Sequence, residues 1–257
     1  MFARRTSVAI YVAKSILMIH FFPQLGSSND EAALPHYGEG DIIWAENQSA
    51  GRGQRGHSWL SNEGLNLTFS YIFEPTFLPA TEQFSLLQAV ALAMVDCLAE
   101  YNIEAKIKWT NDIYVGDNKI VGILMEHKLQ GNCIGRTIAG IGLNVNQTSF
   151  PDSLPNPTSM QLETEEHYER EQVLTRITHH LTRRYEMLRN GEFSRLQEDY
   201  HSRLYRLGEN HCYALPDGTR FQGQITGVEP RGELKITTTE GKEHKFLFKE
   251  VEFVLKN

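Results

Sequence analysis

The chain has 257 residues, enough for one large domain or a large and a small one, and 40% of them are hydrophobic, which suffices for a buried core. The formal net charge of −7 argues against the basic surface of a nucleic-acid-binding protein. Cys97, Cys133 and Cys212 are odd in number and far apart, which indicates reduced thiols in a cytoplasmic protein rather than a disulfide framework or a zinc site.

The N-terminus carries Arg4 and Arg5, followed by an apolar run from Val8 to Ile19 that faintly resembles a signal peptide. Lys14 interrupts this run, which is also too short to span a bilayer. We therefore expect no membrane attachment, and we interpret residues 1–17 as an N-terminal extension or a misassigned start.

The pattern of apolar residues predicts helices and strands in a mixed order. The clearest helix is expected over residues 81–101, where apolar side chains recur at steps of three and four. A shorter helix is expected to start near Ser28, with acids in its first turn. The other predicted helices are 166–189 and 192–207, and the predicted strands are 16–22, 41–46, 65–73, 105–109, 113–115, 119–129 and 135–143. Residues 144–162 are rich in Pro, Ser and Asn and are predicted to form a long loop.

The pattern changes after Gly208. Residues 211–255 contain short alternating segments that are separated by turn sequences. This pattern predicts a small β-barrel of about fifty residues.

The stretch 51–59, GRGQRGHSW, has a composition suited to an anionic ligand. Glycines let the backbone approach a ligand closely, and Arg52 and Arg55 supply permanently charged, forked donors. The spacing also matches the dinucleotide fingerprint, but that motif opens a helix, whereas a loop and a strand are predicted here. An ordinary glycine-rich surface loop stays open as an alternative.

A second polar cluster is expected around the hairpin 108–126, KWTNDIYVGDNKIVGILME. Two apolar runs flank a turn at residues 116–118, as in paired buried strands. Asn111, Asp112, Lys108 and Lys119 would then gather at the strand ends. The plainer alternative is a hairpin whose turn charges are merely solvated.

Together these segments resemble biotin–protein ligases, the enzymes that join biotin to a lysine of a carrier domain. That family has an Arg/Gly-rich loop ending in Trp, then K-W-P-N-D with a further Lys eleven residues after the first, then G-x-G-x-N. The matching segments here are the loop at 51–59, KWTND at 108–112 with Lys119, and GIGLN at 140–144. Upstream, Ser27-Ser28-Asn29 is similar to the family's Ser-Thr-Asn, and Gln48 stands three residues before the loop. The resemblance runs from about residue 18 to the end.

The resemblance implies an α+β fold with a mixed, mostly antiparallel sheet flanked by helices, similar to class II synthetases. It places a catalytic domain at 18–207 and a small all-β barrel, similar to Src-homology-3 domains, at 208–257. It implies that ATP activates biotin as biotinyl-5′-AMP, and that the biotinyl group then passes to a lysine of a biotin carboxyl carrier domain.

The resemblance also implies roles for individual residues. The catalytic residues are Lys119, Arg52 and Asp112, of which Asp112 would bind Mg²⁺. The biotin-binding residues are Ser27, Ser28, Gln48, Gly51, Arg52, Lys119, Gly140 and Gly142, where the last two would leave space for the bicyclic ring. The nucleotide-binding residues are Arg52, Gly53, Arg55, Trp59, Asn111 and Asn144.

The sequence departs from the family pattern in its loop and in KWTND. Gln54 and His57 replace loop arginines, which puts firm retention of the intermediate in doubt, and Thr110 replaces the Pro. A lipoate–protein ligase of the same fold and a non-catalytic biotin-binding adapter stay open as alternatives. We expect a monofunctional protein that binds no DNA, since there is no room for a helix-turn-helix domain before Ser27. The sequence does not say whether it forms a homodimer.

Overall fold

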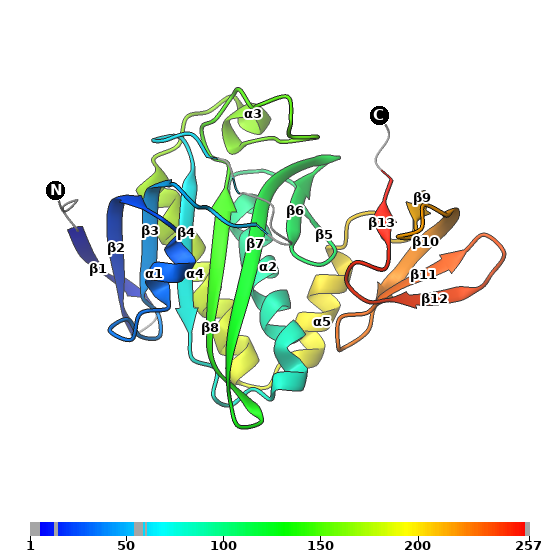
Figure 1. Ribbon diagram of the computed structural model, residues 1–257, viewed down its shortest axis with the longest axis horizontal. Coiled ribbons are helices and arrows are strands. Elements are labelled where there is room, and N and C mark those ends of the chain that lie inside the picture. Colours follow the sequence, from blue (N-terminus) through cyan, green and yellow to red (C-terminus); the bar gives the residue numbers. More distant parts are fainter. Residues whose placement is uncertain (1–5, 13–14, 54–58, 60, 255–257) are drawn as a thin grey trace.

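The computed structural model describes residues 6–12, 15–53, 59 and 61–254, and it contains two β-sheets (Figure 1). The larger sheet has the strand order β1-β2-β3-β4-β8-β7-β6-β5, in which β2 and β3 are parallel and the other neighbours antiparallel. Its strands are β1 (Thr6–Val12), β2 (Ser15–Leu25), β3 (Ile42–Gln48), β4 (Leu67–Phe73), β5 (Lys106–Lys108), β6 (Asp112–Val115), β7 (Asn118–Gln130) and β8 (Cys133–Leu143).

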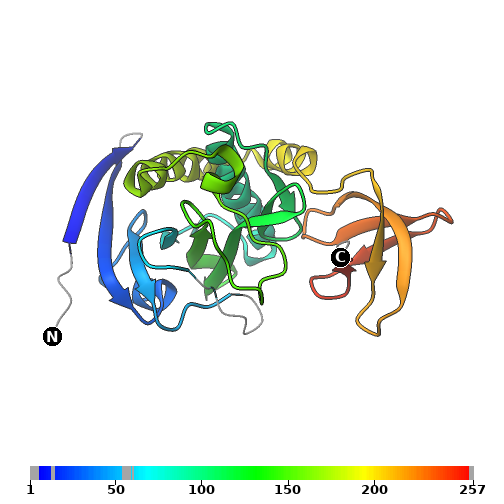
Figure 2. The same ribbon diagram turned by 90° about the horizontal axis from the view of Figure 1, so that it is seen from above.

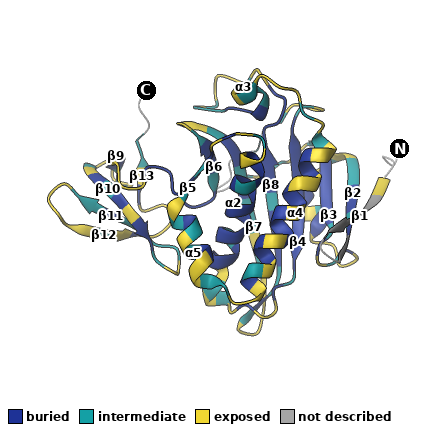
Figure 3. Cartoon of the chain, turned by 180° about the vertical axis from the view of Figure 1, so that it is seen from behind, coloured by how far each residue is buried: buried dark blue, intermediate teal, exposed yellow. Residues whose placement is uncertain are grey.

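Three long helices cover one face of this sheet, as the view from behind shows (Figure 3). They are α2 (Gln83–Ala99), which follows a 3-10 turn η2 (Ala80–Glu82), α4 (Arg170–Arg189) and α5 (Phe193–Ser202). The short helix α1 (Ser28–Ala32) lies against the other face, over β3, β4 and β8, and α3 (Met160–Thr164) lies in the long loop (Figure 1). The segment Ala80–Ala99 is apolar and long enough to cross a membrane, but 72% of its apolar 18-residue window is buried inside the fold, as expected of a core helix.

The alternation of side chains along the strands gives the sheet two different faces. On β4, Leu67, Phe69 and their alternate neighbours join the main core beneath the helices. Thr68 and Ser70 lie between them in sequence and therefore point to the opposite face. The same alternation on β8 directs Ile141 into the core and leaves Gly140 and Gly142 on the opposite face. Small and polar residues thus line the face that α2, α4 and α5 leave uncovered.

The second sheet follows the connection after α5 and lies at one end of the molecule, far from the N-terminus (Figure 2). It comprises β9 (Asn210–Ala214), β10 (Arg220–Val228), β11 (Leu234–Thr238), β12 (Glu243–Phe246) and β13 (Glu252–Phe253), in the order β12-β11-β10-β9-β13. The Trp109 indole N–H donates to the Gly232 carbonyl at 2.9 Å, and the Val228 N–H donates to His201 Nε2 at 2.8 Å. These bonds tie the second sheet to the segment after β5 and to α5.

The predicted α+β class is confirmed, and the small C-terminal unit is all-β as expected. The described strands of this unit pair as an open five-stranded sheet with β12 and β13 at its edges, where the sequence predicted a barrel. The helix predicted over 81–101 corresponds to α2, and the strands predicted from residue 105 to 143 correspond to β5–β8. Part of segment 1–17 forms strand β1, which pairs with β2 at the edge of the larger sheet.

Candidate functional site

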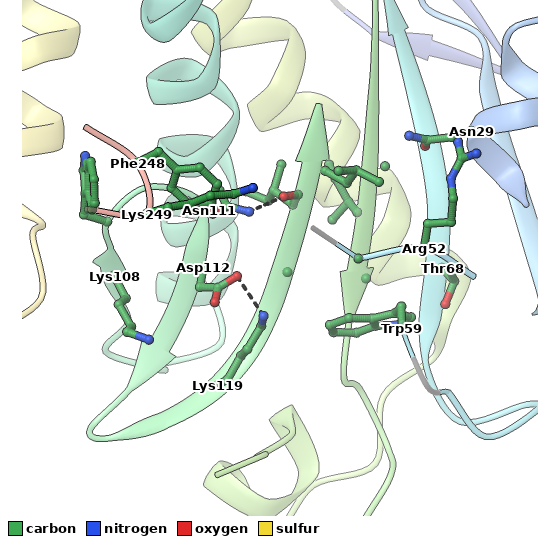
Figure 4. Close-up of a pocket in the computed structure, with 18 of the residues that line it drawn as sticks. Asn29, Arg52, Trp59, Thr68, Lys108, Asn111, Asp112, Lys119, Phe248 and Lys249 are labelled. Atoms are coloured by element: carbon green, nitrogen blue, oxygen red, sulfur yellow. Dashed lines mark hydrogen bonds and ion pairs between the residues drawn. The ribbon is translucent and has the colours of Figure 1, made fainter. Parts of the chain in front are cut away.

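A cavity of about 630 Å³ lies on the uncovered face of the larger sheet and extends to the loop between β12 and β13 (Figure 4). The predicted site residues that line it are Ser27, Ser28, Gln48, Arg52, Gly53, Trp59, Asn111, Asp112, Lys119, Gly140 and Gly142. Arg55 lies outside the described residues, as do Gln54 and His57. Gly51 and Asn144 are adjacent to the cavity-lining segments but do not line the cavity.

The floor of the cavity is made by two rows of residues that cross three neighbouring strands. Gly122, Gly142 and Thr68 are aligned on β7, β8 and β4. In the next row, Gly140 stands between Leu124 and Ser70. Because these positions share one face of the sheet, the side chains they carry or lack decide the shape of the cavity.

The glycines of the two rows make room for side chains of the chain itself. A Cβ at Gly142 would lie 2.1 Å from Trp59 Cε2, and one at Gly122 would lie 2.9 Å from Trp59 Cζ3. A Cβ at Gly140 would lie 2.4 Å from Asn29 Oδ1. The sequence assigned the space beside Gly140 and Gly142 to a bicyclic ligand, whereas here Asn29 and Trp59 fill it.

The β6–β7 hairpin carries an ion pair into the cavity (Figure 4). Lys119 Nζ lies 2.8 Å from Asp112 Oδ1, with side chains that are 33% and 24% exposed, and it lies 5.9 Å from the centre of the Trp59 ring. The turn of the hairpin requires the positive φ of Gly116. At the same turn the Tyr205 hydroxyl donates to Asp117, which holds the pKa of this carboxyl below its usual 3.8. The hairpin is therefore anchored at its tip, and Lys119 is held at a fixed position.

Arg52 is held by two carboxylates at the other side of the cavity. Its Nη2 lies 2.8 Å from Asp30 Oδ1 and 3.1 Å from both carboxylate oxygens of Glu126. The backbone N–H of Trp59 donates to the Gly51 carbonyl at 3.1 Å, which closes the base of the loop. The guanidinium charge is already balanced here, so Arg52 connects α1, the loop and β7.

Two predicted nucleotide-binding amides brace the backbone. Asn111 Nδ2 donates to the Ile123 carbonyl, and its Oδ1 accepts from the Thr110 hydroxyl at 2.9 Å. Asn144 Nδ2 donates to the Thr158 carbonyl at 2.8 Å, and the residue is 4% exposed. Asn144 is thus held away from the cavity, and its contact with a nucleotide stays a prediction.

Ser27, Ser28 and Gln48 line one part of the cavity with side chains that are polar and carry no charge. The Ser28 backbone N–H donates to Gln48 Oε1 at 2.6 Å. Since an N–H can only donate, this bond fixes the orientation of the Gln48 amide and leaves its Nε2 as a donor. Ser27 and Ser28 are both buried.

Several residues at the site were not predicted from the sequence. They are Asn29 on α1, Thr68, Ser70 and Glu126 on the larger sheet, Phe248 and Lys249 on the loop between β12 and β13, and Glu252 on β13. Polar residues at alternate positions in the apolar segment 67–73 are a signal that could have indicated Thr68 and Ser70. The C-terminal loop gives no such signal, because only the docking of the second sheet brings it to the cavity.

A magnesium ion fits the cavity only in part. Among the described residues no three His, Cys, Asp or Glu side chains form a metal-binding group. One carboxylate together with substrate phosphates is a common Mg²⁺ environment, which Asp112 fits. One oxygen of Asp112 is, however, already paired with Lys119.

Comparison with known proteins gives a consistent result. Residues 23–145 match the Biotin/lipoate A/B protein ligase family. The bifunctional ligase/repressor BirA of Bacillus spizizenii is 35% identical over 207 residues, which cover 79% of this chain and 63% of that protein. The biotin–[acetyl-CoA-carboxylase] ligase of Mycobacterium tuberculosis is 26% identical over 220 residues, covering 82% and 80%. This chain therefore spans less than two thirds of the BirA protein that it matches.

A solved structure shares nearly the whole fold. The biotin protein ligase of Aquifex aeolicus, in complex with biotin and ATP, has a TM-score of 0.79 and 25% sequence identity to this chain. The match covers 92% of this chain and 99% of the other. The similarity therefore includes both sheets.

Proposed function

We propose that this chain is a biotin–protein ligase of the biotin/lipoate A/B protein ligase family. It would activate biotin with ATP as biotinyl-5′-AMP and transfer the biotinyl group to a lysine of a biotin carboxyl carrier domain. The observation that carries the proposal is the polarity of the cavity. One side holds the Lys119–Asp112 ion pair, and the end near α1 offers the neutral groups of Ser28 and Gln48. A ligand with a neutral polar ring and a carboxylate tail fits this division.

The chemistry proceeds in two steps. A carboxylate oxygen of biotin attacks the α-phosphorus of ATP, and pyrophosphate leaves. The lysine amine of the acceptor then attacks the acyl carbon of the mixed anhydride, loses a proton and forms an amide, and AMP leaves. Both reactants of the first step are anions, so fixed positive donors supply the main catalytic contribution.

Lys119 is the residue best placed to supply that contribution. Its ammonium enters the cavity and is positioned by Asp112. Removing one such donor typically costs about 3 kcal/mol, or about a hundredfold in rate. A bound Mg²⁺ would further neutralise the phosphates, with Asp112 as the protein ligand. Arg52 would hold the loop over the bound intermediate, and Gly53 and Trp59 would cover it, which excludes water from the anhydride.

We further propose a boundary between a catalytic domain at 18–207 and a C-terminal domain at 208–257. The change from the larger sheet to the second sheet supports this boundary. Three free cysteines support a cytoplasmic location. The chain is proposed to act without binding DNA, as its net charge of −7 favours, and a homodimer remains compatible with the proposal.

The test is ATP- and biotin-dependent labelling of a purified carrier domain. We expect wild type to label the acceptor, an excess of lipoate to leave labelling unchanged, and Lys119→Ala to lower the rate about a hundredfold. Lys128→Ala is the matched control, because Lys128 lies on the same strand but outside the cavity. Suppression of labelling by lipoate would favour the lipoate ligase instead. Biotin binding without any labelling would favour a non-catalytic adapter, and full activity of Lys119→Ala would refute the catalytic assignment.

A further inference from the structure

A chain of hydrogen bonds, buried except at its Glu126 end, connects Glu126 on β7 to the hydroxyl of Ser28 in the cavity wall. Glu126 Oε2 lies 2.6 Å from Asn29 Nδ2, and Asn29 Oδ1 lies 2.6 Å from Ser70 Oγ. Ser70 Oγ lies 2.8 Å from Ser28 Oγ. Ser70 is fully buried and Asn29 is 4% exposed. We propose that Glu126, Asn29 and Ser70 act as positioning residues that fix the Ser28 hydroxyl as a hydrogen-bond acceptor towards the ligand, and so determine ligand specificity.

The direction of each bond in the chain follows from the group at its end. An ionised carboxylate can only accept, so the Asn29 amide must present Nδ2 to Glu126 and Oδ1 to Ser70. An amide oxygen can only accept, so the single proton of the Ser70 hydroxyl is donated to Asn29. The bond between the two serines must then be donated by Ser28. The proton of Ser28 therefore points into the protein, and its remaining lone pairs are left for the cavity.

Two features of the structure hold this chain in place. Arg52 Nη2 contacts both oxygens of Glu126 at 3.1 Å, which holds the carboxylate beside Asn29. Gly140 gives Asn29 room to lie against β8, since a Cβ there would be 2.4 Å from Asn29 Oδ1. Figure 4 shows Asn29 and Arg52 next to each other beside β4. Residues on three separate segments of the chain thus determine that the Ser28 hydroxyl acts as an acceptor towards the cavity.

The ligand implied by this polarity carries an N–H that faces Ser28. Gln48 has the opposite polarity, because its Oε1 is used by the Ser28 N–H and its Nε2 can only donate. A neutral ring with an N–H next to a carbonyl satisfies both, and the ureido group of biotin has this arrangement. This inference rests on the proposed function. It adds three positioning residues, two of them buried, that would make the site bind a ring with an N–H facing Ser28 more tightly than a ring with an oxygen there.

Replacing Glu126 by glutamine should reverse the direction in which each hydrogen bond from residue 126 to Ser28 is donated. Arg52 donates, so it would take the amide oxygen of the new side chain and leave the NH₂ group facing Asn29. The Asn29 amide would then turn over and donate to Ser70, and Ser70 would donate to Ser28. The Ser28 proton would be released towards the cavity, where it would oppose the N–H of the ligand. A mispaired buried hydrogen bond of this kind weakens binding about tenfold to a hundredfold.

The experiment measures Kd by calorimetry for biotin and for two analogues in which one or the other ureido N–H is replaced by a ring oxygen. Wild type is expected to bind at least one analogue about a hundredfold more weakly than biotin, because the Ser28 hydroxyl, which accepts, would face a ring oxygen that also can only accept. Glu126→Gln should reduce this ratio of Kd values about tenfold or more. Ser70→Ala tests the same chain at its middle, because it frees the Ser28 proton without changing any charge. Thermal unfolding shows whether each variant is folded.

Asp30→Asn is the matched control. Asp30 shares Arg52 with Glu126, at 2.8 Å, but its carboxylate has no part in the chain to Ser28. We expect this variant to keep the wild-type ratio even if its affinity for biotin falls. The inference would be overturned if Glu126→Gln and Ser70→Ala both kept the wild-type ratio of Kd values, or if Asp30→Asn lowered this ratio as much as they do. In either case, biotin binding by wild type would still support the proposed function. A wild type that does not bind biotin would overturn both.

Discussion

The packing of Trp59 over Gly122 of β7 and Gly142 of β8 can be tested by adding one methyl group. In Gly142→Ala the new Cβ would lie 2.1 Å from Trp59 Cε2. Carbon atoms in contact are normally about 3.5 Å apart, so the indole would have to retreat by about 1.4 Å. Overpacking of this kind typically costs about 1–3 kcal/mol. We therefore expect Gly142→Ala to lower the free energy of unfolding by that amount.

The assay is urea unfolding of a double-mutant cycle. Trp59→Ala removes the clashing atoms, so adding Gly142→Ala to that variant should change the free energy of unfolding by less than about 0.5 kcal/mol. Gly26→Ala is the control for the glycine itself, because a Cβ there would meet nothing within 4 Å. Replacing a glycine in open space is expected to be neutral or slightly stabilising. Equal destabilisation by Gly142→Ala with and without Trp59 would refute the placement of the indole.

Two further predictions concern the contacts that hold the helices and the second sheet. Burial and the nearby charge of Lys235 lower the pKa of His201 below 6.5, and its neutral Nε2 accepts from the Val228 N–H at 2.8 Å. The unfolded chain therefore binds the proton more readily, so stability should fall as the pH drops below about 6.5. Arg184 is 7% exposed and binds Asp96 and Asp199. Arg184→Met should lower the free energy of unfolding by about 1–3 kcal/mol, because Asp199 loses this ion pair and Asp96 keeps only its pair with the exposed Arg183.

Each of these predictions has its own control. His201→Gln cannot titrate, so its unfolding free energy should vary less between pH 7 and pH 5 than that of wild type, and equal slopes would count against the assignment. Arg195→Met removes an exposed i,i+3 pair with Glu192 and should cost less than about 0.5 kcal/mol. If Arg195→Met lowers the free energy of unfolding as much as Arg184→Met does, the burial of Arg184 is not what makes its ion pairs stabilising.

The order of helices and strands could be predicted from the sequence because each depends on local periodicity. Helix α2 repeats apolar residues at helical spacing, and β6 and β7 are short apolar segments on either side of a glycine turn. The site residues Lys119 and Asp112 could also be identified, because they lie in one hairpin whose turn brings them together. Arg52 was identified from its motif, but its pairing with Asp30 and Glu126 was not.

The α+β class, the hairpin with its lysine and carboxylate, and the resemblance to one family could be read from the sequence, since all of these are encoded in short contiguous segments. The side chains that fill the spaces beside Gly140 and Gly142, and the residues that complete the cavity wall, became known from the folded chain alone. They could not be predicted because sheet register aligns residues that are distant in the chain. Ser70, Gly140 and Leu124 become neighbours through strand pairing alone, and no periodicity within one strand specifies the register of the next.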